Sequence, residues 1–292
     1  MRQQDDYRHQ KNFLQENSVK NKKLLYTLFF IVLLSVYLNL AWDAAGRISP
    51  IYYNMIMGAI FTGFALLHGD TYIGRKSVIV LAVLTFIISF IMEYEGVKTG
   101  VIFGEYYYGN VLGPKALGTV PWLIPLSWFM FMYVSTITVD AAFGGRYTGW
   151  AAMFLFAVLD SMAMTALDIL IDPLWVTKGT WVWTAVHHLP AGSVFYGIPM
   201  QNYFGWILTT MMIFIPYRIC YFMNKSYLTE RNRDYFLPCL IYASIVGVGC
   251  IEALTILSNK GVLFVSLMTG GLFSIGSLLG FMAWRNQSKQ NT

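Results

Sequence analysis

Residues 24–42 read LLYTLFFIVLLSVYLNLAW and contain no charged side chain. A helix needs about 20 mostly apolar residues to cross the hydrocarbon core of a bilayer. This stretch therefore predicts a transmembrane helix. It follows a polar segment of 23 residues, which is why we interpret it as a retained first helix and not as a cleaved signal peptide.

The rest of the chain repeats this pattern. Hydrophobic residues make up 57% of the 292 residues and charged residues only 12%, against about 25% charged residues in an ordinary soluble domain. The sequence therefore predicts an all-α fold, a polytopic integral membrane bundle of about eight transmembrane helices. This composition excludes a soluble globular protein, a disordered chain and a nucleic-acid-binding protein. The seven further apolar windows lie at residues 50–68, 77–92, 121–143, 148–171, 201–223, 236–258 and 261–284.

Lysine and arginine residues are distributed unevenly over the segments between these windows. If the N-terminus lies in the cytoplasm, the cytoplasmic segments carry 14 of them and the outer segments carry 5, with Arg218 inside a window. Positively charged loops favour the cytoplasmic side, so we expect both termini in the cytoplasm and a multi-pass protein of the cell membrane. We expect residues 1–23 to form a basic, disordered cytoplasmic tail, residues 24–284 a single transmembrane helical domain, and residues 285–292 a cytoplasmic C-terminal tail.

Acidic residues gather at one end of the predicted bundle. Two long connections, residues 93–120 and 172–200, lie at the same end and are rich in Gly, Pro, Trp and Tyr. An ionisable group inside the hydrocarbon is costly and is by default a functional hypothesis. We therefore expect a polar chamber near the outer leaflet, covered by the two long loops. The acidic residues that the orientation places at outer helix ends are Asp43, Glu93, Glu95, Asp168, Asp172 and Glu252.

Asp168 and Asp172 are four residues apart, which places both carboxyl groups on one face of a helix. Two carboxyl groups this close rarely ionise together in a medium of low dielectric constant, so one should keep its proton beside an ionised neighbour. The pair would then supply a proton donor and a proton acceptor. Pro173 predicts that the helix ends at this point, and the alternative interpretation is that Asp172 only marks a helix end at the interface.

Other residues with useful chemistry are less well grouped. Glu93 and Glu95 would point to different sides of a helix, so only one should enter the chamber, and the alternative for Glu95 is a surface pair with Lys98. His187 and His188 are adjacent and cannot converge on one metal, although one of them is a candidate for proton transfer. We expect no metal site. The absence of phosphate-binding glycine loops, of a serine-nucleophile elbow and of a lysine in the middle of a window argues against nucleotide enzymes, lipase-like hydrolases and retinal proteins.

Three groups of residues are more specific when they are read together. The first is EYEGVKTG at 93–100 with FGEYYY at 103–108, the second is VPWLIPLSW at 120–128, and the third is DILIDPLW at 168–175 with YGIPMQNYFGW at 196–206. In this order and spacing they resemble the integral-membrane carotenoid biosynthesis family that includes bisanhydrobacterioruberin hydratase and related end-group hydratases. The resemblance covers about residues 85–210.

What the resemblance implies is the addition of water across the terminal isopropylidene double bond of an acyclic carotenoid, giving a tertiary alcohol. It implies a hydrophobic carotenoid as the substrate, the lipid bilayer as the surroundings, and other carotenoid biosynthesis enzymes as partners. We expect no nucleic acid as a partner. We expect no cofactor either, because a hydration needs none.

For this chemistry we interpret Asp168 and Asp172 as the acid and base pair, in either order, with Glu95 or Glu93 as the alternate acid. Tryptophans would line the path of the carbocation and the polyene, although each is equally well explained as an interfacial anchor. Polar side chains near the third group would position water. The tryptophans are Trp122, Trp128, Trp181 and Trp183, and the polar residues are Tyr196, Gln201 and Asn202.

Three other functions stay open at this point. A vinyl-ether lysolipid hydrolase uses the same acid chemistry on a different lipid. An ion-coupled transporter also has buried acids near an aqueous vestibule, although no inverted repeat is visible in this sequence. A structural partner of a carotenoid enzyme complex would need no chemistry of its own.

Overall fold

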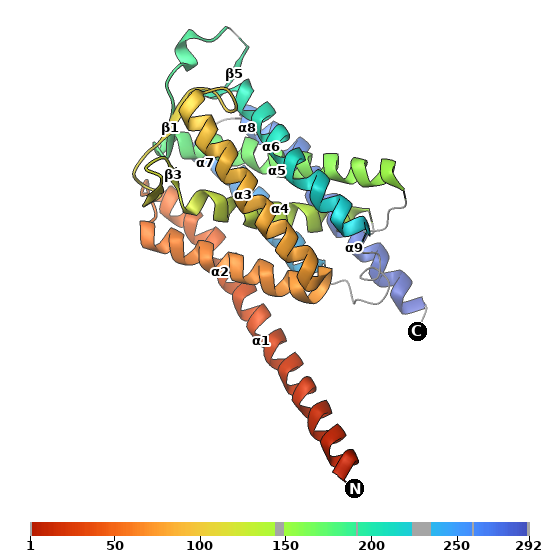
Figure 1. Cartoon of the computed structure of the whole chain (residues 1–292). Coiled ribbons are helices and arrows are strands. Elements are labelled where there is room, and N and C mark those ends of the chain that lie inside the picture. The colour runs from red at the N-terminus through yellow and green to blue at the C-terminus, as the bar shows by residue number, and fades with distance from the viewer. Residues whose placement is uncertain (1, 144–148, 191, 224–234, 259, 291–292) are drawn as a thin grey trace.

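The computed structural model describes the backbone of residues 2–143, 149–190, 192–223, 235–258 and 260–290, and the side chains of those that lie within residues 21–283. Long apolar helices dominate it (Figure 1). The helices are α1 (Arg2–Ala44), α2 (Ile51–Gly69), α3 (Arg75–Thr99), α4 (Leu123–Ala142), α5 (Trp150–Thr177), α6 (Met200–Met223), α7 (Phe236–Thr255), α8 (Lys260–Ser266) and α9 (Leu272–Gln290). Two π-helical turns, Asp70–Gly74 and Leu267–Gly271, precede α3 and α9.

Within the described residues, seven continuous helical stretches are long and apolar enough to cross a membrane. One of them, Ile51–Thr99, has 49 residues, which corresponds to about 74 Å of helix and is more than twice the thickness of a bilayer core. Gly74 interrupts it, because its φ of 99° and ψ of 142° are not helical. The chain therefore turns back there, and α2 and α3 are separate crossings (Figure 1). Each of the eight predicted windows thus has its helix, and the prediction of a polytopic helical membrane bundle is confirmed.

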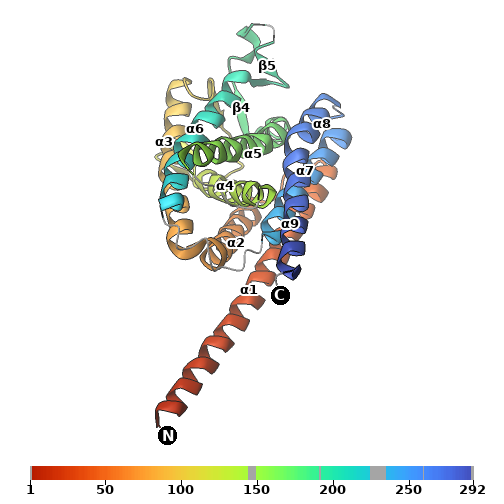
Figure 2. The same cartoon turned by 90° about the vertical axis from the view of Figure 1, so that its right-hand side faces the viewer.

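The two long connections meet at one end of the bundle. They pair through β1 (Tyr106–Tyr108) and β4 (Trp181–Trp183), which are antiparallel with Tyr106 opposite Trp183. Two further short pairs are formed by β2 (Lys115–Ala116) with β3 (Val120–Pro121) and by β5 (Val194–Phe195) with β6 (Ile198–Pro199). Figures 1 and 2 show these strands at the end of the bundle that faces away from both chain termini. The two termini thus lie on the same side, and their cytoplasmic location stays a prediction.

The first helix is longer than a membrane crossing requires. α1 begins at Arg2, so the backbone is helical through residues 2–23, for which the sequence predicted a disordered tail. Figure 2 shows this part of α1 projecting beyond the rest of the bundle. The apolar part of α1 is Asn21–Ala44. The division of the chain into two tails and one transmembrane domain stays a prediction.

Helix α5 continues past Pro173, and the prediction that it ends at Asp172 is wrong. Proline removes one N–H donor from a helix, which leaves the carbonyl four residues earlier without its usual partner. Membrane helices tolerate this change where neighbouring helices pack closely. Both Asp172 and Pro173 are buried, so α5 carries Asp172 inside the protein and not at an interfacial helix end.

A buried ion cluster joins the three central helices at the end opposite to the long loops. The Arg218 guanidinium of α6 donates to Asp160 of α5 through Nε at 2.6 Å and Nη2 at 2.7 Å, and through Nη1 to Asp140 of α4 at 2.7 Å. Its Nη2 also contacts Thr136 Oγ1 at 2.8 Å. Arg218 and Asp160 are 0% exposed and Asp140 is 1% exposed. A buried charge is tolerated only when its partners match it, so this cluster fixes how α4, α5 and α6 pack.

We expect Arg218→Met to destabilise the protein by about 3–5 kcal/mol, because it leaves two carboxylates buried without their cation. The measurement is unfolding of the purified full chain in mixed detergent micelles. The triple variant that also carries Asp140→Asn and Asp160→Asn should recover part of the loss. Arg75→Met is the matched control, since its pair with Asp70 is exposed and should contribute little. Equal effects of Arg218→Met and Arg75→Met would contradict the prediction.

Candidate functional site

A cavity of about 250 Å³ lies beneath the paired loops. Its walls come from α1 to α7 and from the loop strands β1 and β4. Five of the six acidic residues that the sequence assigned to outer helix ends line this cavity, among many apolar and aromatic side chains, namely Asp43, Glu93, Asp168, Asp172 and Glu252. Glu95 does not line it.

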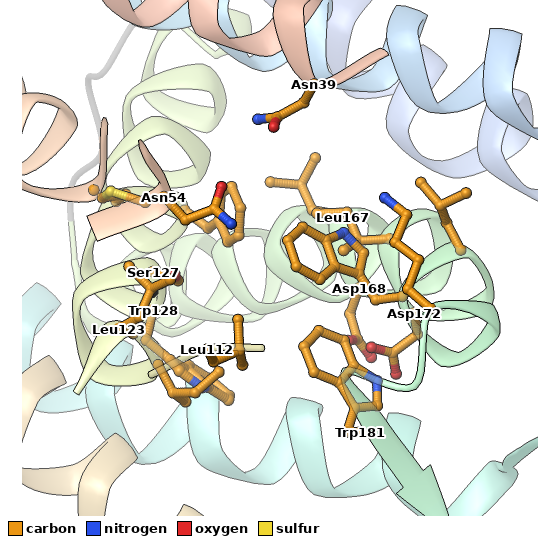
Figure 3. Close-up of a pocket in the computed structure, with 18 of the residues that line it drawn as sticks. Asn39, Asn54, Leu112, Leu123, Ser127, Trp128, Leu167, Asp168, Asp172 and Trp181 are labelled. Atoms are coloured by element: carbon orange, nitrogen blue, oxygen red, sulfur yellow. Dashed lines mark hydrogen bonds between the residues drawn. The ribbon is translucent and has the colours of Figure 1, made fainter. Parts of the chain in front are cut away.

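Asp168 and Asp172 share one hydrogen-bond donor. The amide nitrogen of Asn202, near the start of α6, donates to Asp168 Oδ2 at 3.0 Å and to Asp172 Oδ2 at 2.8 Å. The three side chains are 2–3% exposed. The spacing of four residues brings both carboxyl groups to one face of α5, and they lie side by side at the edge of the cavity (Figure 3). The pair therefore combines burial, close approach and access to the cavity.

Glu93 is held differently, by three donors from two segments. Tyr106 and Tyr108 of β1 donate to Glu93 Oε2 at 2.5 and 2.6 Å, and Trp128 Nε1 of α4 donates to Oε1 at 2.8 Å. Residues 106 and 108 point to the same side of a strand, so both hydroxyls reach one carboxyl group. Burial and the neighbouring Glu93 carboxyl raise the pKa of the Tyr106 and Tyr108 hydroxyls well above the usual range. These hydroxyls therefore stay protonated and act as donors.

Aromatic rings form much of the remaining wall. Trp128 stacks on Trp206 with ring centroids 4.1 Å apart, and Trp175 stacks on Trp181 at 5.7 Å. Trp183 donates from Nε1 to the Phe103 carbonyl at 2.8 Å. All five tryptophans line the cavity. That Trp128, Trp181 and Trp183 line the path of a substrate stays a prediction. Such a wall suits a long unsaturated hydrocarbon and a transient cation.

Several other predicted residues lie outside the cavity. Glu95 is exposed on α3, because two residues along a helix turn it away from Glu93. Trp122 is 53% exposed and Tyr196 is 45% exposed, and neither lines the cavity. Gln201 donates to the carbonyls of Gly100 and Val101, at 3.0 and 2.5 Å, and thus ties α6 to the first long loop. Their predicted roles in catalysis and binding are therefore not supported by their positions.

The two adjacent histidines that the sequence suggested for proton transfer do not line this cavity. His187 and His188 are exposed in a short 3₁₀ turn away from the cavity lining. Within the described part of the chain, no group of three or more His, Cys, Asp and Glu side chains is arranged to hold a metal ion.

The sequence did not single out several residues that line the cavity. Lys178 Nζ pairs with Asp43 Oδ1 at 2.5 Å and also lies 4.9 Å from the centre of the Trp175 ring. Tyr106 and Tyr108 could have been found from the sequence, because they are alternate residues in a run of three tyrosines and alternate residues of a strand share one face. No sequence pattern indicated the role of Lys178, because its partner Asp43 is 135 positions away on the first helix and only the folded chain brings the two together.

Comparison with known proteins points to one family. The family described as carotenoid biosynthesis protein matches residues 50–273. A bisanhydrobacterioruberin hydratase from Haloarcula japonica is 35% identical over 163 residues, which make up 56% of this chain and 51% of that protein. The match therefore spans about half the length of this curated relative. No solved structure matches the chain.

The raised pKa values of Tyr106 and Tyr108 predict a spectroscopic result. Free tyrosine ionises near pH 10, so these two hydroxyls should stay protonated in the folded protein when the pH rises through that value. In an absorbance titration at about 295 nm, the variant Tyr106→Phe/Tyr108→Phe should gain as much tyrosinate signal as the unchanged protein while both are folded. In denaturant the variant should fall short by two tyrosines. A shortfall of two in the folded state would contradict the prediction.

Proposed function

The chain belongs to the carotenoid biosynthesis protein family, and from this premise we propose that it is a carotenoid hydratase. It adds water across the terminal isopropylidene double bond of an acyclic carotenoid and forms a tertiary alcohol. The observation that carries this proposal is the Asp168 and Asp172 pair, bridged by Asn202 and open to an aromatic cavity inside a membrane bundle. The related hydratase supports the reaction class.

The pair performs both proton transfers. One carboxyl group, in its protonated form, gives its proton to the CH carbon of the double bond, and the alkene electron pair forms the new C–H bond. The positive charge then lies on the carbon that carries two methyl groups. A water oxygen attacks this carbon while the other carboxylate accepts a proton from the water. Transfer of that proton between Asp168 and Asp172 restores the starting state, and the net reaction is alkene plus water to alcohol.

Glu93 acts on the cation. Three donors reach its carboxyl oxygens, which fixes their position and lowers the cost of a carboxylate at this buried position. A fixed negative charge near the developing cation stabilises the transition state. The rings of Trp128 and Trp181, which line the same cavity, add their π faces. We therefore propose that Glu93 stabilises the charge when it is ionised, and it stays the alternate acid when it carries a proton.

The charges of the cavity favour a neutral lipid as substrate. Among the described residues that line it, Lys178 is the one cation, and Asp43 already pairs with it. A phosphate head group would require cations that are free to bind it. This argues against a vinyl-ether lysolipid hydrolase. The proposal includes a location in the cell membrane, no cofactor, and other carotenoid biosynthesis enzymes as partners that supply the acyclic pigment.

We expect Asp168→Asn and Asp172→Asn each to lower hydration by about 100-fold or more, since each removes a proton donor or acceptor. The measurement is expression in a host that accumulates lycopene, followed by mass spectrometry of the pigments for a gain of one water. The matched control is Glu105→Gln, an exposed carboxyl residue at the same end of the molecule, which should leave the product unchanged. Full turnover by both aspartate variants would refute the assignment of the pair.

A further inference from the structure

One side of the cavity is polar in a way that the two proton transfers do not explain. Ser35, Asn39 and Asp43 follow one another at intervals of four residues on α1, and all three line the cavity. Lys178 approaches Asp43 from the C-terminal end of α5, and Glu252 faces them from α7. Figure 3 shows Asn39 and Asn54 on one side of the cavity and Asp168 and Asp172 on the other.

Asn39 is the unusual member of this polar side. Ser35 donates to the Val32 carbonyl at 2.7 Å, and Asn54 exchanges hydrogen bonds with Ser49. The Asn39 amide makes no hydrogen bond to another described residue, although its side chain is half-buried and points into the cavity (Figure 3). A polar amide that is removed from bulk water is costly unless it has a partner. The geometry therefore leaves this amide ready for a polar ligand in the cavity.

The polar groups next to the carboxyl pair are satisfied within the protein. Figure 3 places the Trp181 indole beside Asp172, and its N–H acts as a hydrogen-bond donor to that carboxyl group. Asn202 donates to both carboxyl groups of the pair. The amide without a partner among the described residues therefore lies on the α1 side of the cavity.

The charges on the polar side select a small neutral ligand. Lys178 and Asp43 offset each other, so the α1 side offers hydrogen bonds without a free positive charge. Lys178 lies six residues beyond Asp172, a rise of about 9 Å along the helix, and both residues line the same cavity. The opposite wall is aromatic and suits the hydrocarbon.

We propose that Asn39, with the Asp43 and Lys178 pair behind it, binds and orients the water molecule that the hydration consumes. This inference rests on the proposed function and adds the site of its second substrate. The hydrocarbon then occupies the aromatic side. Water enters the cavity from the α1 side and attacks the carbocation next to the carboxylate that accepts its proton. Asn39 is a positioning residue for water, whereas Asp168 and Asp172 move protons.

Weaker water binding has a distinct chemical consequence. A carbocation that meets no water loses a proton to a carboxylate, either from the carbon just protonated or from a neighbouring methyl group. The first path returns the original alkene and the second gives an isomeric alkene. In deuterium oxide the acid delivers deuterium. The second path keeps this deuterium, and the first path keeps it when the original hydrogen is removed, so both can give deuterium-labelled hydrocarbon without added oxygen. The ratio of labelled hydrocarbon to alcohol therefore reports on water binding separately from protonation.

The experiment compares membranes that contain the full-length protein, incubated with lycopene in deuterium oxide. Asn39→Leu should raise the ratio of labelled hydrocarbon to alcohol by about tenfold, the effect of one lost hydrogen bond. Asn39→Ser, which keeps a hydrogen-bonding group, should give an intermediate ratio and guards against misfolding of the leucine variant. Ser266→Ala is the matched control, because Ser266 lies outside the cavity lining with its hydroxyl already bonded to the Val262 carbonyl, and its ratio should equal that of the unchanged protein.

Two results would overturn the inference while leaving the proposed function intact. One is an unchanged ratio in both Asn39 variants. The other is an equal loss of labelling and hydration, which would mean that Asn39 acts on the hydrocarbon or on folding. If the unchanged protein gives neither labelled pigment nor alcohol, the proposed function fails and this inference fails with it.

Discussion

The structure depends on one constraint: an ionisable group that is buried among membrane helices needs a partner inside the protein. Arg218, Glu93 and the Asp168 and Asp172 pair all obey it, and each draws its partners from other helices or loops. Because these partners are far apart in the sequence, satisfying them fixes how the helices pack. The same contacts that hold the bundle together therefore build the site.

The two ends of the bundle satisfy their carboxyl groups in different ways. Asp160 and Asp140 are paired with the Arg218 guanidinium and do not line the cavity beneath the long loops. Asp168 and Asp172 share a neutral amide and face the cavity. A neutral donor leaves a carboxyl group able to gain and lose a proton, whereas a cation opposes protonation. This contrast is why proton chemistry is assigned to the end beneath the long loops.

The long loops are part of the site and not only a cover. Pairing of β1 with β4 sets Tyr106 and Tyr108 over Glu93 and brings Trp181 and Trp183 to the cavity. Gln201 fastens the first loop to α6, one residue before Asn202. Loop placement and the geometry of the carboxyl pair are therefore coupled through the start of α6. The proposed reaction requires that bulk water be kept from the carbocation, and we expect the aromatic loop region to do this.

The sequence by itself determined the apolar helices, the shared end of the acidic residues, and the pairing of Asp168 with Asp172, because each follows from local periodicity along one helix. It also carried the resemblance that indicated the family. Only the tertiary structure decided that Asn202 bridges the pair while Gln201 binds the first long loop. It also decided that Glu93 lines the cavity while Glu95 and Trp122 do not. The pairing of Arg218 with Asp140 and Asp160 is the third such feature. The reason is physical: hydrophobic periodicity gives the face of a helix, but the partner across the gap depends on how far neighbouring helices slide and rotate when their side chains pack.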